Sequence, residues 1–425
     1  MGITVACVRV AATVSTAPYT QDVTTTDLGG LTPKAAIIIG SRAITDATAV
    51  AHNVVSYGAC TGATNEWVVA ASDEDAVADS DNDCFFDDDF CVLFVNPGDQ
   101  TVDGSAEFSA FIANGLTINW TDAPAGAYFL TVIFFAGTDL SAYAASFTHT
   151  AALDVAEAIT APGFRPTDVL LAYTTGVSTT DGNNTQYMLS LGLVHDAAGT
   201  VTMRSLTWGH QVTAAAGQDN SQFRTDYCLG NVQPSDGALI RAYDASAFGA
   251  NGFSLTKRIF GGDRGIGYLA LAFGGVVSSW VGTVTTPTAT GNRADTGPGF
   301  KPQAVVMLMG GAEVAATAYT DGRGGIGGVS AITATAQQSV AWASEDAAAT
   351  MNTQSLADDQ AVNLPDHAGA ALIAATYVSL DATGFTLNYS AVSATAKLWP
   401  ALVIGAVSAQ SVVPILMRQY RQRRI

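Results

Sequence analysis

The densest group of potential metal ligands in the sequence is a run of carboxylates that begins at Asp79. Asp79, Asp81 and Asp83 alternate with other residues, and carboxylate oxygens are the ligands that Ca²⁺ prefers. The EF-hand pattern does not continue, because Cys84 takes the place of the turn glycine and Phe90 that of the bidentate glutamate. We therefore favour a solvated acidic loop here and keep calcium as the alternative; no other cofactor is expected.

The five histidines do not form a catalytic or metal-binding motif. Two of them adjoin an acid, in His195-Asp196 and Asp366-His367, but no G-x-S-x-G turn supplies a nucleophile. A Ser-His-Asp site that forms only in the folded chain stays open. Surface or loop histidines are the favoured interpretation, so we expect no enzymatic activity.

Two Asp-Gly turns, Asp181-Gly182 and Asp321-Gly322, follow apolar runs at similar distances. Arg323 follows the second turn as a polar anchor. Asp-Gly favours a tight turn, and loops carry binding functions more often than the elements that they connect. We therefore favour simple hairpin turns here and keep contact loops at these five residues as the functional alternative.

A threefold internal repeat must position these residues. A Gly-apolar-x-Pro turn with a following apolar run reads GLTPKAAIIIG from Gly30, GFRPTDVLLAY from Gly163 and GFKPQAVVMLMG from Gly299. Proline fixes φ and cannot donate to a ladder, which suits the entry of a strand. The run after each turn is predicted to be a buried strand.

Two further landmarks recur in the same order. A Gly-apolar-Thr/Ser-apolar motif reads NGLTINW, NGFSLTK and TGFTLNYS, and its alternation predicts strands whose buried faces include Leu116, Phe253 and Phe385. A closing apolar run follows from Tyr128, Tyr268 and Leu398. A single tryptophan lies between the first two landmarks in each repeat: Trp67, Trp208 and Trp342.

The repeats predict an all-β fold of three tandem antiparallel β-sandwich domains with a jelly-roll-like architecture. We place the domains at 1–139, 140–276 and 277–408, followed by an arm at 409–425. The first strand of each domain is expected at Cys7–Ser15, Ser146–Ala152 and Trp280–Thr286.

Composition excludes several classes of protein. Hydrophobic residues reach 48% and charged residues only 13%, which argues against intrinsic disorder and against a coiled coil. The net charge of −19 argues against nucleic-acid binding. Five cysteines without a C-x-x-C pair predict neither a disulfide framework nor a zinc site, and the N-terminus does not resemble a secretory signal.

The C-terminal region contains an uncharged stretch, Leu398–Met417, followed by arginines. Its length fits a membrane span, but its prolines and polar residues do not, and its first half is the closing run of the third repeat. We therefore expect no membrane span. The remaining residues form a predicted assembly arm, which pairs apolar with basic side chains: Ile415, Leu416, Arg418, Arg421, Arg423 and Arg424.

At its landmarks the chain resembles repeat modules of tailed-bacteriophage virion proteins, in which a GFxPxxV strand precedes a DGFT(L/I) strand and a YxxxxF run. The matching segments are Gly163–Pro166 with Val169, Gly252–Leu255, Tyr268–Phe273, Gly299–Pro302 and Gly384–Leu387. The third repeat departs at Trp399-Pro400, and the first has Leu31 and Leu116 where the modules have phenylalanine. The motifs are short and structural, so no catalytic residue carries over.

The resemblance implies a non-enzymatic structural protein of the virion, made in the host cytoplasm. A tail or tail-fibre component that contributes to host contact is the leading expectation, and a capsid decoration protein is the alternative. Its partners would be other virion proteins, copies of itself and, on the host, a surface glycan or protein. A secreted glycan-binding or glycan-cleaving β-sandwich protein is the alternative from another class.

Deletion of residues 411–425 tests the assembly arm. An exposed apolar segment beside charges usually marks a contact, and the acidic remainder of the chain offers a surface for the arginines. We expect the truncated protein to be lost from particles, as measured by its ratio to the other particle proteins after purification. Normal incorporation with unchanged salt sensitivity would instead indicate a solvated terminus.

Overall fold

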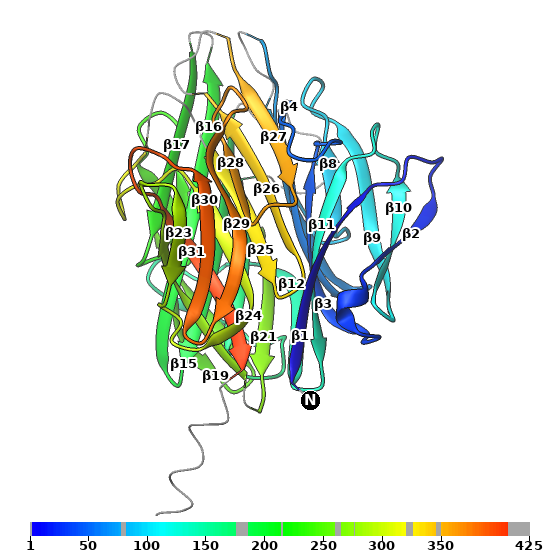
Figure 1. The fold of residues 1–425 in the computed structure, drawn as a ribbon, viewed down its shortest axis with the longest axis vertical. Coiled ribbons are helices and arrows are strands. Elements are labelled where there is room, and N and C mark those ends of the chain that lie inside the picture. Colours follow the sequence, from blue (N-terminus) through cyan, green and yellow to red (C-terminus); the bar gives the residue numbers. More distant parts are fainter. Residues whose placement is uncertain are drawn as a thin grey trace, which may run out of the picture.

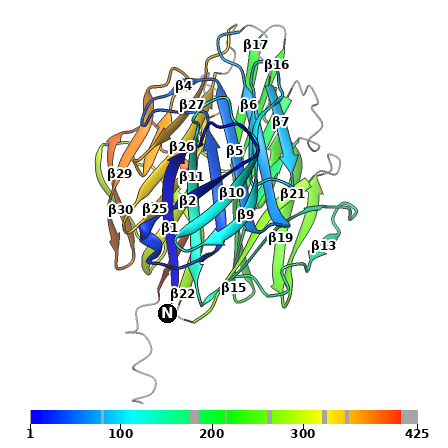
Figure 2. The same ribbon diagram turned by 90° about the vertical axis from the view of Figure 1, so that its right-hand side faces the viewer.

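The computed structural model describes residues 2–77, 82–175, 186–213, 216–259, 265–275, 277–319, 326–345 and 350–406. Strands make up almost all of the regular structure of these residues, with one 3-10 turn, η1 (Thr26–Leu28) (Figures 1 and 2). The strands pair antiparallel. The all-β fold class is therefore confirmed.

The strands fall into three consecutive sets, which we call units 1, 2 and 3. Unit 1 contains β1 (Ile3–Ala11), β2 (Tyr19–Thr24), β3 (Pro33–Ser41), β4 (Val50–Ala51), β5 (Asn53–Gly62), β6 (Asn65–Asp73), β7 (Asn82–Asp87), β8 (Val92–Val95), β9 (Val102–Ile112), β10 (Gly115–Asp122) and β11 (Phe129–Gly137). Unit 2 contains β12 (Leu140–Thr148), β13 (Ala156–Ile159), β14 (Asp168–Thr174), β15 (Gln186–Ala197), β16 (Thr200–Thr213), β17 (Ala216–Arg224), β18 (Leu229–Val232), β19 (Leu239–Gly249), β20 (Gly252–Ile259) and β21 (Gly265–Phe273). Unit 3 contains β22 (Val277–Thr285), β23 (Gly291–Asp295), β24 (Lys301–Gly310), β25 (Ile326–Thr333), β26 (Gln337–Ser344), β27 (Thr353–Asp358), β28 (Val362–Pro365), β29 (Ala371–Asp381), β30 (Gly384–Ala391) and β31 (Leu398–Ala406).

Each unit is a sandwich of a larger and a smaller sheet. The larger sheets have the order β1-β11-β3-β5-β6-β7, β12-β21-β14-β15-β16-β17 and β22-β31-β24-β25-β26-β27-β4. The smaller sheets have the order β2-β10-β9-β8, β13-β20-β19-β18 and β23-β30-β29-β28. In every unit the first strand pairs with the last strand in the larger sheet, and the second strand pairs with the last but one in the smaller sheet, as in a jelly roll. The other strands form meanders.

Short links join the strands of consecutive units. The chain passes from unit 1 to unit 2 between Gly137 and Leu140, and from unit 2 to unit 3 between Phe273 and Val277. The units nevertheless share an apolar core, described below. Division into three domains, each able to fold alone, therefore stays a prediction.

The Gly-apolar-x-Pro landmark forms the entry to the same strand in each unit. Gly30, Gly163 and Gly299 have φ values of 87°, 71° and 74°, a left-handed conformation that favours glycine. The prolines lie within two residues of the first residue of β3, β14 and β24: Pro33, Pro166 and Pro302.

The glycine of the second landmark is required by close backbone packing. Gly115, Gly252 and Gly384 begin β10, β20 and β30 directly after a turn. A Cβ atom at these positions would lie 1.8–2.0 Å from a carbonyl oxygen of β2, β13 or β23. A side chain would therefore push the outer strand off the smaller sheet.

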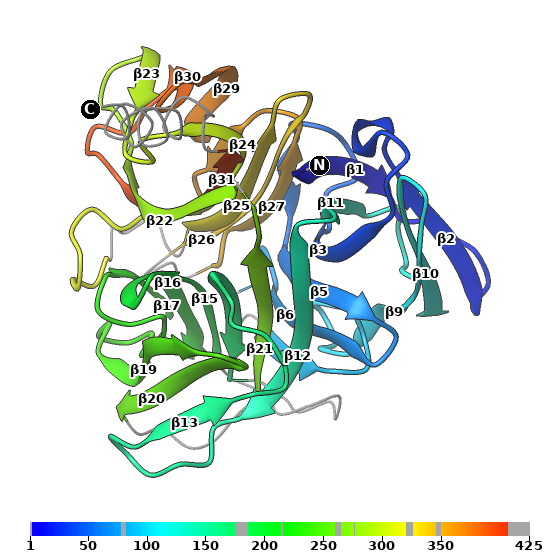
Figure 3. The same ribbon diagram turned by 90° about the horizontal axis from the view of Figure 1, so that it is seen from below.

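The larger sheets turn one face toward a centre that the three units share (Figure 3). There the rings of Trp208 and Trp342 meet edge to face with their centroids 5.3 Å apart. Trp67 lies on β6, the strand of unit 1 that corresponds to β16 and β26. Its position in the sheet register is four residues before the position equivalent to Trp208 and Trp342. Its indole nitrogen donates to the carbonyl oxygen of Tyr268 in unit 2 at 2.8 Å. The tryptophans are thus all central, but only two of them are equivalent.

The first strand of each unit lies on a neighbouring unit. The backbone nitrogen of Ala144 in β12 donates to Thr61 Oγ1 of unit 1 at 2.9 Å. Ser279 in β22 donates to Asp168 of unit 2 at 2.5 Å. β1 packs against β24, β25 and β26 of unit 3. Unit 2 therefore contacts unit 1, unit 3 contacts unit 2, and unit 1 contacts unit 3.

The loops that follow β3 and β24 also cross to a neighbouring unit, from unit 1 to unit 3 and from unit 3 to unit 2. Ala47 and Ala316 follow β3 and β24 by six residues, and both have left-handed φ values, 54° and 58°. The Ala47 nitrogen donates to the carbonyl oxygen of Ala357 in unit 3 at 3.0 Å, and the Ala316 nitrogen to that of Phe223 in unit 2 at 2.9 Å. β4 then extends the sheet of unit 3. Each unit thus uses one surface to contact a different surface of the next unit, and the third contact returns to unit 1, so the units form a closed ring.

The first strands begin earlier than the sequence suggests. We expected them from Cys7, Ser146 and Trp280, whereas they begin at Ile3, Leu140 and Val277. The earlier residues pair with the last strand of their own unit, for example Ile3 with Gly137. That pairing joins the two ends of a repeat, so no local pattern reveals it.

Replacement of Phe253 by alanine tests the sandwich core of unit 2. Phe253 is buried, as are the corresponding Leu116 and Phe385, which confirms their predicted core positions. We expect the free energy of unfolding to fall by about 3–5 kcal/mol in a denaturant titration. Val378→Ala, at a position that is 45% exposed, is the control and should change it by less than about 0.5 kcal/mol. An equally small effect of Phe253→Ala would contradict the assigned core.

Candidate functional site

Most site residues expected from the sequence lie outside the described part of the chain: Asp79, Asp81, Asp181, Gly182, Asp321, Gly322, Arg323, Ile415, Leu416, Arg418, Arg421, Arg423 and Arg424. The contact loops and the assembly arm therefore stay predictions. Asp83 is described, and it is a buried residue of β7 rather than part of a solvated loop. Its Oδ1 accepts a hydrogen bond from the backbone nitrogen of Cys84 at 2.7 Å.

Polar side chains from all three units meet at one level of the shared centre. By sheet register, Asp73 of β6, His210 of β16 and Ser344 of β26 occupy corresponding positions. Asp219 is the register partner of His210 on the adjacent β17. All four residues are at most 1% exposed. We call Asp73, His210, Asp219 and Ser344 the axial cluster.

The imidazole of His210 lies between two carboxylates of the axial cluster. Its Nδ1 lies 2.8 Å from Oδ1 of Asp219, and its Nε2 lies 3.2 Å from Oδ1 of Asp73. Ser344 Oγ donates to the same oxygen of Asp219 at 2.7 Å. The Tyr187 ring stacks on the imidazole at a centroid distance of 5.5 Å. The His210 side chain thus links unit 2 to Asp73 of unit 1, and the Ser344 hydroxyl links unit 3 to Asp219 of unit 2.

The protonation state of His210 follows from this geometry. Burial alone would lower the pKa of His210, but the carboxylates of Asp219 and Asp73 raise it to about 10. His210 is therefore a cation at neutral pH. A buried cation that bridges two carboxylates holds the units in a defined orientation, because separation would leave buried charges without partners.

The axial cluster contains the residue types of a hydrolytic triad in a different order. In such a triad the serine bonds to histidine and the histidine to the carboxylate, whereas here Ser344 bonds to Asp219. The cluster is also closed to substrates by its burial. The axial cluster therefore acts as a buried polar contact that holds the three units together; we call this contact the lock.

A second Ser-Asp-His contact joins units 2 and 3. His195 Nδ1 lies 2.9 Å from Oδ1 of Asp168, and Ser279 Oγ donates to Oδ2 of Asp168 at 2.5 Å. Burial opposes the charged imidazole, but Asp168 raises the pKa of His195 overall. The carboxylate of Asp168 bonds to both side chains, and Ser279 Oγ also lies 3.4 Å from His195 Nδ1. The site therefore holds β22 against unit 2.

One group of described carboxylates has the spacing of a metal site. Ligand oxygens of Asp46, Asp358 and Asp359 lie within 4.8 Å of one another. Protein groups already bond to them: Arg9 forms an ion pair with Asp46 at 2.5 Å, and the side chain of Gln360 donates to Asp358 at 3.1 Å. Burial, with Asp46 and Asp358 nearby, raises the pKa of Asp359. The cluster is best explained as part of the junction between units 1 and 3.

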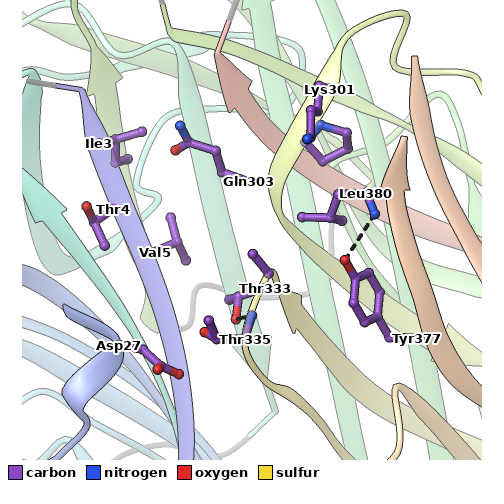
Figure 4. A pocket seen from close by; sticks show the side chains of 12 residues that line it. Ile3, Thr4, Val5, Asp27, Lys301, Gln303, Thr333, Thr335, Tyr377 and Leu380 are labelled. Carbon is purple, nitrogen blue, oxygen red and sulfur yellow. Dashed lines mark hydrogen bonds between the residues drawn. The ribbon is translucent and has the colours of Figure 1, made fainter. Parts of the chain in front are cut away.

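A groove of about 400 Å³ lies at that same junction (Figure 4). Figure 4 shows Ile3, Thr4 and Val5 of β1 on one side and Gln303 and Leu380 of unit 3 on the other. Its charged lining residues are Asp27 from η1 and Lys301 from β24, and Gln303 has a buried Oε1 without a hydrogen-bond partner.

The corresponding position at the junction of units 1 and 2 has a direct contact between the units. Lys34 stands in β3 where Gln303 stands in β24, and its Nζ donates to the carbonyl oxygen of Leu140 at 2.7 Å. This lysine ties unit 1 to the start of unit 2. At the junction of units 1 and 3, Gln303 Oε1 is buried and has no hydrogen bond among the described residues.

No protein-family model, curated protein or solved structure matches this chain. In the described ranges, no helix has the length and apolar character required to cross a membrane. The first half of the uncharged C-terminal stretch forms β31, as expected from the repeat.

Sequence reasoning missed the axial cluster. Its residues are far apart in the chain, and only one signal was available: His210 and Ser344 each stand two positions after the equivalent Trp208 and Trp342. A polar residue at the end of an apolar face can indicate a buried polar contact. The pattern gives no indication of which carboxylates it meets, because these come from β6 and β17.

Replacement of His210 by glutamine tests the lock. The variant leaves two buried carboxylates without their cation, so we expect the free energy of unfolding to fall by about 3–5 kcal/mol. His367→Gln is the control, because among the described residues this partly exposed histidine has one ion-pair contact, with Glu345 at 3.5 Å. The control should change the free energy by less than about 1 kcal/mol.

The pH dependence of stability distinguishes the contribution of the His210 charge from that of its packing. Because the folded-state pKa of His210 is raised, its contribution is complete below about pH 6.5 and is lost as the pH rises toward 10. Between pH 7 and 9 the difference in stability between wild type and His210→Gln should therefore shrink, as measured by denaturant titration at each pH. A difference that stays constant would show that His210 does not act through its charge.

Proposed function

We propose that the chain is a non-enzymatic structural protein of a tailed-phage virion, a tail or tail-fibre component that contributes to host contact. The landmark motifs that resemble virion repeat modules support this proposal, and the antiparallel sandwiches are of the kind that such modules imply. In this proposal the chain is made in the host cytoplasm and functions in the particle, with other virion proteins and copies of itself as partners.

The ring of three units is the observation that carries the proposal. Successive units contact one another through corresponding first strands, and the last contact returns to unit 1. Ring closure through unlike surfaces is the geometry of a cyclic oligomer, here within one chain. It presents similar outer sheets three times around one axis, which suits a position of threefold symmetry in a larger assembly (Figure 3).

The same geometry favours a second candidate, a capsid decoration protein. Three similar units around an axis also suit a threefold position on a capsid surface. A glycan-cleaving enzyme has less support, because glycoside hydrolysis uses two carboxylates about 5–9 Å apart in a cleft. The groove at the junction of units 1 and 3 has a single carboxylate in its lining, Asp27.

Gold-labelled antibodies raised against the purified chain test the location. On particles of the phage that encodes the chain, we expect label at the tail or its fibres in electron micrographs. Antibody absorbed beforehand with the purified chain is the control and should leave the particles bare. Label on the capsid would support the decoration protein instead. Unlabelled particles that also lack the chain by mass spectrometry would contradict both.

A further inference from the structure

A pocket of about 560 Å³ in unit 1 contains a cation without a carboxylate partner. It lies between the end of β3, the short β4 and the loop before β11. Arg42, His52 and Tyr128 supply its polar lining, and Ile44 and Val50 supply apolar lining. We call it the Arg42 pocket.

The guanidinium of Arg42 lies beside the Tyr128 hydroxyl and has no ion pair among the described residues. Its Nη1 is buried and has no hydrogen-bond partner, and no carboxylate of the described residues forms an ion pair with it. A buried donor without a partner is costly, so a ligand that accepts its hydrogen bond is stabilised there.

His52 and Tyr128 add polar groups beside this cation. Burial, followed by the charge of Arg42, lowers the pKa of His52, so its imidazole is neutral at pH 7. Its Nδ1 accepts a hydrogen bond from the backbone nitrogen of Asp75 at 3.0 Å. The imidazole proton is therefore on Nε2, which can donate. The Tyr128 hydroxyl donates to Asp103 at 2.8 Å, which fixes the ring.

Unit 3 contains the corresponding pocket in a neutralised form. Lys397 directly precedes β31 as Tyr128 precedes β11, and it lines a pocket of about 390 Å³ with Tyr319. Its Nζ lies 2.7 Å from Glu313 and 2.8 Å from the Tyr319 hydroxyl. Glu313 follows β24 by three residues, and the residue that follows β3 by three is Ile44. The same place therefore holds an acid in unit 3 and an apolar residue in unit 1.

We infer that the Arg42 pocket binds the carboxylate of an acidic sugar such as a hexuronic acid. One guanidinium matches one carboxylate through two parallel hydrogen bonds. The apolar lining suits the C–H face of a sugar ring, and the volume lies in the usual range of small-molecule sites. A phosphate dianion fits less well beside a single cation. The inference rests on the proposed function, since a sugar of the host surface would be the ligand.

Calorimetric titration of the full chain with glucuronate tests the inference, with glucose and inorganic phosphate as comparison ligands. We expect wild type to bind glucuronate and not glucose. Arg42→Gln should weaken binding about tenfold or more, because the charge-assisted hydrogen bonds are lost. Arg258→Gln, which removes an arginine already paired with Asp154 and Asp244, should bind like wild type.

A second variant keeps the arginine and supplies the acid of unit 3. Ile44 is 56% exposed, so Ile44→Glu should fold, as checked by an unchanged melting temperature. It should pair with Arg42 and weaken glucuronate binding about tenfold. Thr45→Glu places the same charge on an adjacent exposed residue that does not line the pocket, and it should bind like wild type.

Three results would overturn the inference: no binding of glucuronate by wild type, wild-type affinity in a folded Arg42→Gln variant, or equal affinity for glucose. Phosphate binding as tight as that of glucuronate would overturn the sugar carboxylate as the ligand and leave a general oxyanion site. None of these results depends on where the chain lies in a particle, so they are distinguishable from the antibody experiment.

Discussion

The structure depends on an apolar face that no unit can bury alone. The central strands β3, β14 and β24 are apolar on both sides: Ile38, Leu171 and Met307 face the smaller sheet of their own unit, whereas Ile37, Leu170 and Val306 face the common centre. A face of that kind in water would be unfavourable for each sandwich. Three such faces cover one another only when the units close around an axis. The first strands and the loops that cross to a neighbour then fill the junctions.

The sequence contains the information for strands and turns but little for the ring. The landmark glycines and prolines could be assigned because their roles are local: Gly30 needs a left-handed φ, and Pro33 begins a strand. A continuous apolar run such as IIIG does indicate burial on both faces. It does not indicate what covers the second face. Trp67 illustrates the difficulty, since it lies on the expected strand but at another level, where it meets unit 2.

The candidate sites were harder to predict for the same reason. The axial cluster combines residues 73, 210, 219 and 344, whose proximity is a property of the ring and not of any repeat. Corresponding positions also diverge: Thr61, His195 and Thr333 stand at one level of β5, β15 and β25, and each joins a different contact. Comparison of the repeats reveals what they share, which is the fold. Sites that depend on a difference between repeats become visible only when the units are placed side by side.

Equivalent register positions in the three units are occupied by Asp73, His210 and Ser344. This has a consequence for how such a ring can evolve. Three identical chains around an axis would bring three copies of one side chain together, and three aspartates or three histidines would repel each other. A continuous chain escapes this symmetry, so an acid, a base and a hydroxyl can meet at one point. The order of the repeats is then no longer arbitrary. Each unit has become complementary to one particular neighbour, and exchange of two repeats would preserve every strand while separating the groups that hold the centre together.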